Sequence, residues 1–251
     1  MPASSLKTCL ITGAAGGVGR ALVRAFREAD YTVVATDVAD EPTDLGAHRY
    51  IKADLKEFAA DEAYASGIVE ELRGCIDGNG LHVLINNAAI QILGGTDSLD
   101  RADWRATLDV NLLSPFLLAQ AFLSELEQAS GCIVNISSIH AKLTKANFVA
   151  YATSKAALSG MTRAMAVDLG PRVRVNAVEP AAIETPMLRA GFGASEEGFQ
   201  RLASYHPAGK IGSVSELSRL VLLIADSENS FLHGAVVGFD GGIGNVLRDP
   251  C

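Results

Sequence analysis

The chain has 251 residues, of which 49% are hydrophobic and 20% are charged, and its formal net charge is -8 at pH 7. This composition is too apolar for a disordered protein, and its 24 glycines follow no collagen-like period. The negative charge disfavours nucleic acid and anionic membrane surfaces as partners, because it repels their phosphate groups. We therefore expect one soluble globular domain over residues 1–251.

The cysteine pattern predicts neither a zinc site nor a disulfide framework, because the four cysteines are scattered and form no C-x-x-C pair. The start of the chain, 1–7, does not combine a basic segment with a long apolar one. The longest apolar run, 220–225, is far too short to cross a membrane. We expect a cytoplasmic protein without a metal ion or a membrane anchor.

Short apolar or β-branched runs predict strands, and stretches of helical period lie between them. The strands are expected at 8–12, 32–36, 49–53, 83–86, 132–136, 173–178 and 235–239, and the main helices at 20–29, 61–73, 103–128, 151–169 and 215–225. Several strands are apolar at consecutive positions, which indicates a sheet covered on both faces. The expected fold class is α/β: a single doubly wound, Rossmann-type domain with about seven parallel strands and helices on both faces.

The segment 181–210 fits none of these elements. It carries glycines at 191, 193, 198 and 209 among apolar residues, and it is longer than most connections in compact domains. Connections of this length are usually functional, so we expect a substrate loop or lid here.

A glycine-rich turn follows the first strand. Thr12-Gly13-Ala14-Ala15-Gly16-Gly17-Val18-Gly19 leads directly into a helix, where backbone N–H groups and the helix dipole can hold a pyrophosphate. The spacing departs from the dinucleotide fingerprint G-x-G-x-x-G, and tight packing of a strand on a helix also requires glycine. The turn alone leaves both interpretations open.

Asp37 ends the second strand about 20 residues after the glycines, where an acidic side chain can bind the hydroxyls of a ribose. A carboxylate at this point repels a 2′-phosphate. No Lys or Arg lies between Val33 and His48, and the residue before Gly17 is not basic. This pattern favours NAD over NADP; the alternative is that Asp37 only caps a turn.

Tyr151 and Lys155 are four residues apart in a helical stretch and therefore share one helix face. A tyrosine has an ordinary pKa of about 10, and a positive charge at about 4 Å is worth about 4 kcal/mol at an effective dielectric constant of about 20. That energy would lower the tyrosine pKa by about three units and allow acid/base chemistry near neutral pH. Taken by itself, the pair also fits an ordinary exposed helix.

Further motifs follow in chain order: Asp54-Leu55, Asn86-Asn87-Ala88-Ala89, Asn111, Ser137-Ser138, Asn176-Ala177-Val178-Glu179-Pro180, Ile183-Glu184-Thr185-Pro186 and Phe239-Asp240-Gly241-Gly242. With the glycine turn and the Tyr151/Lys155 pair, their order and spacing resemble the short-chain dehydrogenase/reductase family, classical type. The resemblance covers residues 8–242.

The resemblance implies an NAD-dependent oxidoreductase that interconverts a secondary alcohol and a ketone by hydride transfer, with oxidation as the expected direction. Tyr151 would be the general acid/base, Lys155 would lower its pKa and bind the nicotinamide ribose, and Ser138 would bind the substrate oxygen. Asn111 would kink its helix and hold a water that relays protons from Lys155; otherwise it is a buried residue bonded to its own backbone. The residues implied for the cofactor are Gly13, Gly17, Val18, Gly19, Asp37, Asp54, Leu55, Asn87, Ala88, Tyr151, Lys155, Pro180, Ile183 and Thr185.

Two positions depart from the family's pattern. Ala89 and Ala181 stand where the family usually has glycine. An added methyl group narrows the allowed backbone, so both turns should keep a negative φ or be strained.

The expected substrate-binding residues are Gln91, Ser138, His140, Asn147, Tyr151 and Met187, with Glu179 and the segment 181–210 as further candidates. Gln91 together with His140 resembles the subgroup that acts on short 3-hydroxy acids. The lysine of that subgroup is Phe148 here, and Lys142 or Lys145 could replace it. Substrate identity stays open, since apolar residues of the segment either suit an amphipathic ligand or form a plain cover: Met187, Leu188, Phe192, Phe199 and Tyr205.

Two other functions are compatible with the sequence: an NADP-linked carbonyl reductase, and a non-catalytic NAD-binding regulator. The filled catalytic positions argue against the regulator. The helices that contain Asn111 and Tyr151 resemble those that pair between subunits in the family, so we expect a homotetramer or a homodimer.

Overall fold

Seven parallel strands form the central sheet of the computed structural model, which describes residues 7–186, 188–189 and 195–247. Neighbouring strands follow the order β3-β2-β1-β4-β5-β6-β9, and every pair is parallel. Their bounds are β1 Lys7–Thr12, β2 Tyr31–Asp37, β3 Arg49–Lys52, β4 Val83–Asn86, β5 Cys132–Ile136, β6 Arg174–Pro180 and β9 Val236–Phe239. The expected doubly wound, Rossmann-type fold is confirmed.

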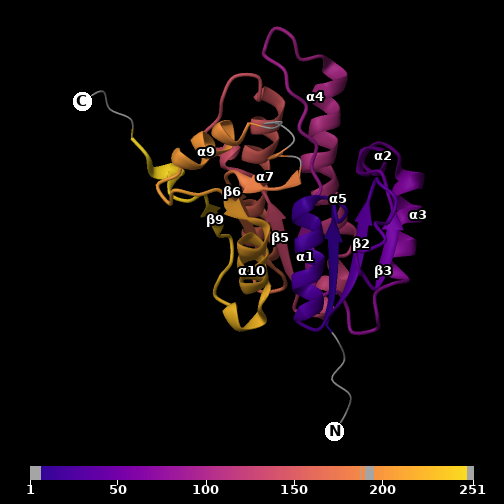
Figure 1. Ribbon diagram of the computed structural model, residues 1–251. Helices are drawn as coiled ribbons and strands as arrows, with labels where there is room; N and C mark the ends of the chain where they lie inside the picture. Colours follow the sequence, from indigo (N-terminus) through magenta and orange to yellow (C-terminus); the bar gives the residue numbers. More distant parts are fainter. Residues whose placement is uncertain (1–6, 187, 190–194, 248–251) are drawn as a thin grey trace.

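Helices cover both faces of this sheet, and α1 and α10 lie side by side on one of them (Figure 1). The α-helices are α1 Gly17–Glu28, α2 Leu55–Ala60, α3 Glu62–Arg73, α4 Arg101–Leu108, α5 Ser114–Ala121, α6 Leu123–Gln128, α7 Val149–Leu169, α9 Glu196–Ser204 and α10 Val214–Ala225. Short 3₁₀ turns occur at η2 Ile139–Ala141, η3 Ser227–Asn229 and η4 Ile243–Asn245.

The continuous apolar runs of the strands follow from burial on both faces. Ile11 belongs to the core cluster that contains Phe26 of α1 and Val221 of α10. Its neighbour Leu10 belongs to the opposite cluster, with Phe58 of α2. Because successive side chains of a strand point to opposite faces, no position in the middle of this sheet remains for a polar residue facing water.

The predicted helix 103–128 is not continuous. It is divided into α4, a π-helical turn η1 (Asp109–Leu113), α5 and α6. Pro115 stands at the start of α5, where the missing N–H is tolerated. Helical periodicity persists through such a turn, which is why the pattern suggested one element.

The segment 181–210 contains regular structure. Ile183–Glu184 forms β7, which pairs in parallel with β8 (Gly212–Ser213). Helix α9 lies between these two strands in the chain. Phe199, Ala203 and Ile211 form a small apolar cluster of their own. Two of the predicted lid residues, Met187 and Phe192, lie outside the described residues.

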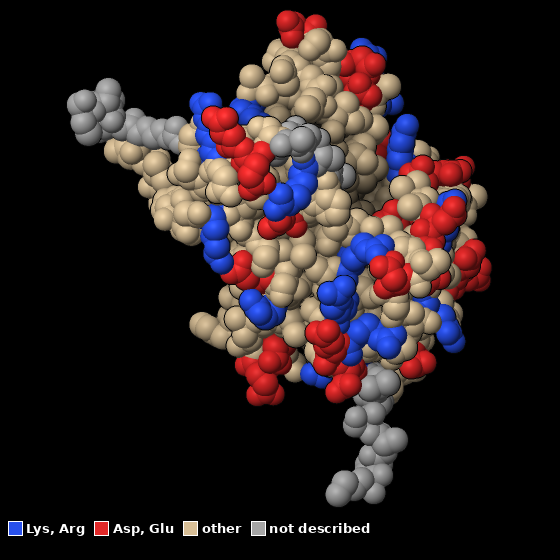
Figure 2. Space-filling model, in the orientation of Figure 1, with Lys and Arg blue, Asp and Glu red and all other residues tan. Residues whose placement is uncertain are grey.

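The surface carries charges of both signs. On the face drawn in Figure 2, acidic and basic side chains are interspersed, with no large field of one sign. Within 7–186, 188–189 and 195–247, no helix is both long and apolar enough to cross a membrane. The same residues bring together no cluster of three or more His, Cys, Asp or Glu suited to a metal ion.

Parallel strands all end at the same edge of the sheet. The strand order reverses between β1 and β4, and in doubly wound sheets the crevice at such a switch point holds the ligand. The loops that leave β1, β2, β4, β5 and β6 at this edge carry the predicted site residues.

Candidate active site

The glycine turn after β1 is shaped by positions at which a side chain does not fit. Gly13 has a φ of +66°, and a Cβ atom there would lie 2.7 Å from the Ala88 Cα. A Cβ atom on Gly19 would lie 2.0 Å from the Gly13 carbonyl oxygen. Gly16 precedes α1 without a side-chain cap, and the first turn of α1 contains no acidic residue. The first N–H groups of α1 therefore form a site suited to an anionic group such as a pyrophosphate.

The loop after β4 holds this turn in place. The Asn87 side-chain amide donates hydrogen bonds to the carbonyl oxygens of Thr12 (3.0 Å) and Gly13 (2.9 Å). In return, the Thr12 hydroxyl accepts from the backbone N–H groups of Asn87 and Ala88, both at 3.0 Å. Asn87 and Ala88 thus lie directly against the glycine turn.

Asp37 contacts the same turn from the end of β2. Its Oδ2 accepts from the Ala15 N–H (2.9 Å), and its Oδ1 accepts from the Ala39 N–H (3.1 Å). The carboxylate therefore both caps its own turn and joins the glycine loop, so the two interpretations from sequence coexist.

A lysine near Asp37 was not apparent in the sequence. Lys52 is the cross-strand neighbour of Asp37 in β3, and its Nζ binds Asp40 Oδ1 at 2.7 Å. Burial, and after it the negative charges of Asp37, Glu41 and Asp40, raise the pKa of Tyr50 to about 12. The end of β2 is thus acidic, and Lys52 beside it is already paired with Asp40. Lys52 lies beside Asp37 because of the β2–β3 strand register, which the sequence does not show.

Asp54 and Leu55 open α2. The Asp54 side chain caps the helix by accepting from the Lys56 N–H at 2.8 Å, and the Tyr64 hydroxyl accepts from the Asp54 N–H at 2.9 Å. The Leu55 side chain is buried in the core. Both residues lie at the edge where β3 ends, next in the sheet to Asp37.

The segment 180–186 approaches the glycine turn from the other side. A Cβ atom on Gly17 would meet the Thr185 side chain at 3.1 Å, so these two predicted cofactor residues are neighbours. Pro180 ends β6 and Ile183 is buried in β7. Positive φ values outside glycine occur, among the described residues, at Asp30, Ser130 and Asn147. Ala89 and Ala181 therefore keep negative φ values, which is the unstrained alternative.

Tyr151 lies in the first turn of α7 beside Ser138, which follows β5 and caps the short helix η2. Burial raises the pKa of the Tyr151 phenol above its ordinary value, and a hydrogen bond with the Ser138 side chain acts in the opposite direction. Two distant parts of the chain thus bring a hydroxyl and a phenol together at one point.

Lys155 departs from the expectation drawn from its spacing. Its Nζ donates to the Ile136 carbonyl oxygen at 2.7 Å and lies 5.8 Å from the centre of the Tyr151 ring. Burial lowers the pKa of Lys155 to about 8, since its side chain is 2% exposed. The predicted lowering of the Tyr151 pKa by Lys155 is therefore wrong for this structure, because the ammonium group turns to a carbonyl oxygen and burial of the phenol dominates.

Asn111 is buried in the π-helical turn η1, which gives the predicted distortion of its helix. Its Oδ1 accepts from the Ile90 N–H at 2.8 Å, and its Nδ2 donates to the Ile90 carbonyl (2.9 Å) and to Ser154 Oγ (3.0 Å). Ser154 Oγ in turn donates to the Tyr151 carbonyl oxygen at 2.7 Å. Asn111 thus links the loop after β4 to the first turns of α7.

An aromatic stack borders Tyr151. The rings of His140 and Phe148 are stacked in parallel, with centroids 4.4 Å apart. Both rings make edge-to-face contacts with the Tyr151 ring. Lys145 Nζ lies 4.7 Å from the centre of the Phe148 ring. Burial, and after it the charge of Lys145, lower the pKa of His140, which favours the uncharged ring. The sequence showed Phe148 only as the residue in place of a lysine; its stacking on His140 was not predicted, because no spacing signals a stacking partner.

The other predicted substrate residues lie around this stack at different depths. The Asn147 carbonyl accepts from the Gly94 N–H at 2.9 Å, which joins the loop after β4 to the loop after β5. Gln91 is exposed in the former loop. Lys142 points elsewhere and pairs with the buried Glu179 at 2.8 Å. Of the two lysines considered as replacements at Phe148, Lys145 is therefore the one beside the stack.

The comparisons with known proteins identify oxidoreductases. Residues 13–244 match the family model described as enoyl-(acyl carrier protein) reductase. The chain is 32% identical over 260 residues to trans-4-hydroxycyclohexanecarboxylate dehydrogenase of Sinomonas cyclohexanicum, covering 96% of this chain and 95% of that protein. It is 33% identical over 242 residues to the 3-oxoacyl-(acyl-carrier-protein) reductase FabG of Thermotoga maritima, covering 94% and 97%.

Solved structures extend the same likeness. Ligand-free aldohexose dehydrogenase of Thermoplasma acidophilum matches with a TM-score of 0.86 at 30% identity, covering 98% of this chain and 97% of that one. Other solved neighbours include 4-hydroxyisoleucine dehydrogenase with NADH and ElxO with NADP bound. The likeness therefore fits a nicotinamide nucleotide and does not distinguish its two forms.

Proposed function

Because the chain belongs to the short-chain dehydrogenase/reductase family, we propose that it is an NAD-dependent oxidoreductase interconverting a secondary alcohol and a ketone by hydride transfer. The observation that carries this proposal is the Ser138 side chain placed against the Tyr151 phenol, where it acts to lower the phenol pKa, with Lys155 buried one helical turn away. These groups meet at the edge of the sheet where the glycine turn also lies.

The residues of the edge fit a dinucleotide. The glycine turn and the first N–H groups of α1 would hold the pyrophosphate, because the turn leaves no room for side chains and the helix terminus attracts negative charge. When bound, the nicotinamide supplies or accepts the hydride. Other residues would contact the rest of the dinucleotide: Asp37, Asp54, Leu55, Asn87, Ala88, Lys155, Pro180, Ile183 and Thr185.

Tyr151 would move the proton. In alcohol oxidation its phenolate oxygen takes the hydroxyl proton while the carbon loses its hydride, and in ketone reduction the phenol returns that proton to the carbonyl oxygen. Ser138 would donate a hydrogen bond to the same substrate oxygen and so orient it. Lys155 would bind the nicotinamide ribose, and Asn111 would support the first turns of α7.

The acidic end of β2 favours NAD. A 2′-phosphate placed beside Asp37 would face three carboxylates, Asp37, Asp40 and Glu41, with Lys52 already paired to Asp40. Like charges at short range disfavour such binding. An NADP-linked carbonyl reductase is the second candidate, because relatives include FabG and because Lys52 lies in register with Asp37.

The assembly and location are also proposals. Phe116 of α5 and Val167 of α7 are exposed apolar side chains on helices near the site, which supports pairing of these helices between subunits in a homotetramer or homodimer. Light scattering coupled to gel filtration measures this directly. A cytoplasmic location is supported by Cys9, Cys75 and Cys132 being free.

The decisive experiment is a dehydrogenase screen with NAD over hydroxy acids, sugars, polyols, steroids and dihydrodiols. Tyr151→Phe removes one hydroxyl and should reduce turnover by about a thousandfold while NADH binding stays nearly unchanged. Retained turnover in this variant would contradict the assignment of Tyr151. A wild-type protein that binds NADH and oxidises no substrate of the panel would instead favour a non-catalytic NAD-binding regulator.

A further inference from the structure

A buried carboxylate lies between the two elements that carry Ser138 and Tyr151. Glu179, near the end of β6, is 3% exposed. Its Oε1 accepts from Ser159 Oγ at 2.8 Å, and its Oε2 lies 2.8 Å from Lys142 Nζ. Ser159 belongs to α7, as Tyr151 does, and Lys142 directly follows η2, which Ser138 caps. One carboxylate thus bridges the helix and the loop.

The bridge continues to the backbone of Lys155. Ser159 Oγ lies 2.8 Å from Ser137 Oγ, and Ser137 Oγ donates to the Lys155 carbonyl oxygen at 2.9 Å. Because a carboxylate only accepts hydrogen bonds and Ser159 has a single hydroxyl proton, Ser159 donates to Glu179 and accepts from Ser137, whose one proton is shared between Ser159 and the Lys155 carbonyl oxygen. Ser137 is the neighbour of Ser138, so both catalytic elements are attached to Glu179 by short polar contacts.

Such a carboxylate is costly to bury unless it is paired and hydrogen-bonded. Lys142 is the cation in direct contact with it, and the Lys142 side chain is itself 63% exposed. The loop is therefore held by a lysine that reaches inward from the surface to compensate a buried charge. Removing either partner leaves the other without its counter-charge.

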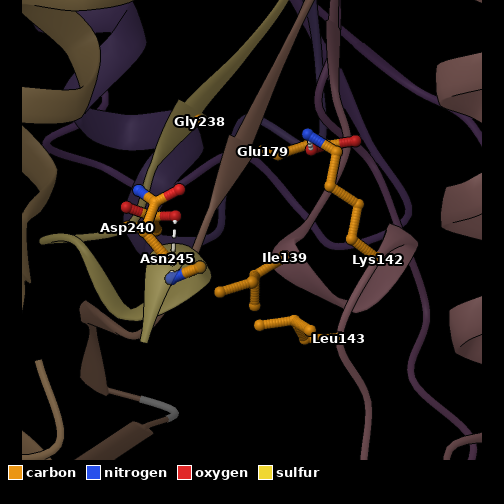
Figure 3. Close-up of a pocket in the computed structure, with 8 residues that line it drawn as sticks. Ile139, Lys142, Leu143, Glu179, Gly238, Asp240 and Asn245 are labelled. Carbon is orange, nitrogen blue, oxygen red and sulfur yellow. Dashed lines mark hydrogen bonds and ion pairs between the residues drawn. The ribbon is translucent and has the colours of Figure 1, made fainter. Parts of the chain in front are cut away.

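The loop also borders a cavity on this side. Lys142 and Glu179 line a cavity of about 400 Å³, across which Ile139 and Leu143 face Asp240 and Asn245 (Figure 3). The ion pair between Lys142 and Glu179, marked in Figure 3, crosses the edge of this cavity and ties the loop to β6.

We propose that Glu179 is a positioning residue that sets the distance between Ser138 and Tyr151, acting on the loop through Lys142 and on α7 through Ser159. The proposal rests on the function proposed above, in which both hydroxyl groups bind one substrate oxygen. Misplacement of such a group by about 1 Å can cost about a hundredfold in rate. The surface residue Lys142 consequently influences turnover without touching substrate.

The test compares Glu179→Gln, Lys142→Met and the double variant in steady-state kinetics with a substrate found by the NAD screen. Glu179→Gln keeps the shape and an acceptor for Ser159 but loses the charge. We expect kcat to fall about tenfold to hundredfold in each single variant, with the NADH dissociation constant unchanged. The double variant should be no slower than the slower single variant, because both changes break the same link.

Arg172→Met is the matched control. It removes an exposed ion pair with Glu127 just before β6, at the opposite end of that strand. It should leave kcat unchanged. If Lys142→Met keeps wild-type kcat, or if the two single effects add fully in the double variant, the proposal is overturned. Lys142→Met keeps the test open should Glu179→Gln fail to fold, since Lys142 is largely exposed.

A pH profile separates positioning from general destabilisation. The Ser138 hydrogen bond lowers the Tyr151 pKa, so a loosened loop should move the rise of kcat/KM for oxidation to higher pH by about one unit. The other charged or titratable groups facing Tyr151 are His140 and Lys155, with Lys145 over Phe148, and all remain in the variants. An unshifted profile with a lowered kcat would indicate only structural damage and overturn the proposal. A wild-type protein without turnover would instead contradict the proposed function.

Discussion

The glycine turn after β1 and the loop after β5 lie at the same edge of the sheet but are held in different ways. The turn is defined by the backbone: Gly13 and Gly19 leave no space for a side chain, and Asn87 binds carbonyl oxygens. The loop is defined by side chains, namely the His140 and Phe148 stack and the pair of Lys142 with Glu179. A backbone-defined site suits an invariant ligand such as a dinucleotide, whereas a side-chain-defined site can be changed residue by residue for a substrate.

The largest effect on cofactor binding is expected from Gly13→Ala, which disrupts the backbone-defined region. The added Cβ atom would lie 2.7 Å from the Ala88 Cα at a φ of +66°. We expect NADH binding to weaken about a hundredfold, equivalent to about 3 kcal/mol, as measured by fluorescence titration. Gly67→Ala in α3 meets no atom within 4 Å, and it should raise stability by about 0.5–1 kcal/mol with unchanged NADH binding. Equal behaviour of the two variants would refute a backbone-defined site.

Asp37→Ala tests whether the same region also selects the cofactor. Loss of the carboxylate removes hydrogen bonds to the ribose hydroxyls, so NADH should bind about tenfold more weakly while NADPH binding improves. Asp40→Asn frees Lys52 from its ion pair, so NADPH should bind more tightly while NADH binding stays unchanged. Measuring both dissociation constants checks this, and tighter binding of NADPH than NADH by the unchanged protein would reject NAD as the cofactor.

The pH dependence of turnover tests the boundary between the two regions, where Tyr151 lies. Oxidation requires the phenolate, and burial raises the Tyr151 pKa, so kcat/KM for oxidation should rise by up to about tenfold per pH unit between about pH 6 and 8. Above about pH 8 Lys155 loses its charge, and the slope should decrease. Reduction requires the protonated phenol and should not rise over this range. A rise in both directions would contradict the role of Tyr151.

The smallest effect is expected from Lys145→Met, which alters the side-chain-defined region. Lys145 lies over Phe148 beside the site and is exposed, so its attraction for a carboxylate is worth at most about 1 kcal/mol. The KM of hydroxy acids should rise up to about fivefold, and that of neutral alcohols should not change. Equal KM changes for both classes would show that Lys145 does not recognise the charge of the substrate.

The sequence was sufficient where chemistry is local. Runs such as 8–12 and 132–136 predicted the strands because burial on both faces requires consecutive apolar residues. The glycine turn was recognisable because a φ of +66° at Gly13 favours glycine. The sequence failed to predict the break in helix 103–128. The π-helical turn around Asn111 keeps an apolar pattern while changing the hydrogen bonding.

What the sequence determined by itself was the fold class, the place of the glycine turn and the residues expected at the edge of the sheet. The tertiary structure decided how those residues meet: Lys52 beside Asp37 through strand register, Lys155 on the Ile136 carbonyl, and Glu179 between Lys142 and Ser159. The physical reason is one of range. Hydrophobic period and glycine stereochemistry act over a few residues, whereas burial, pairing and pKa depend on groups that only folding brings together.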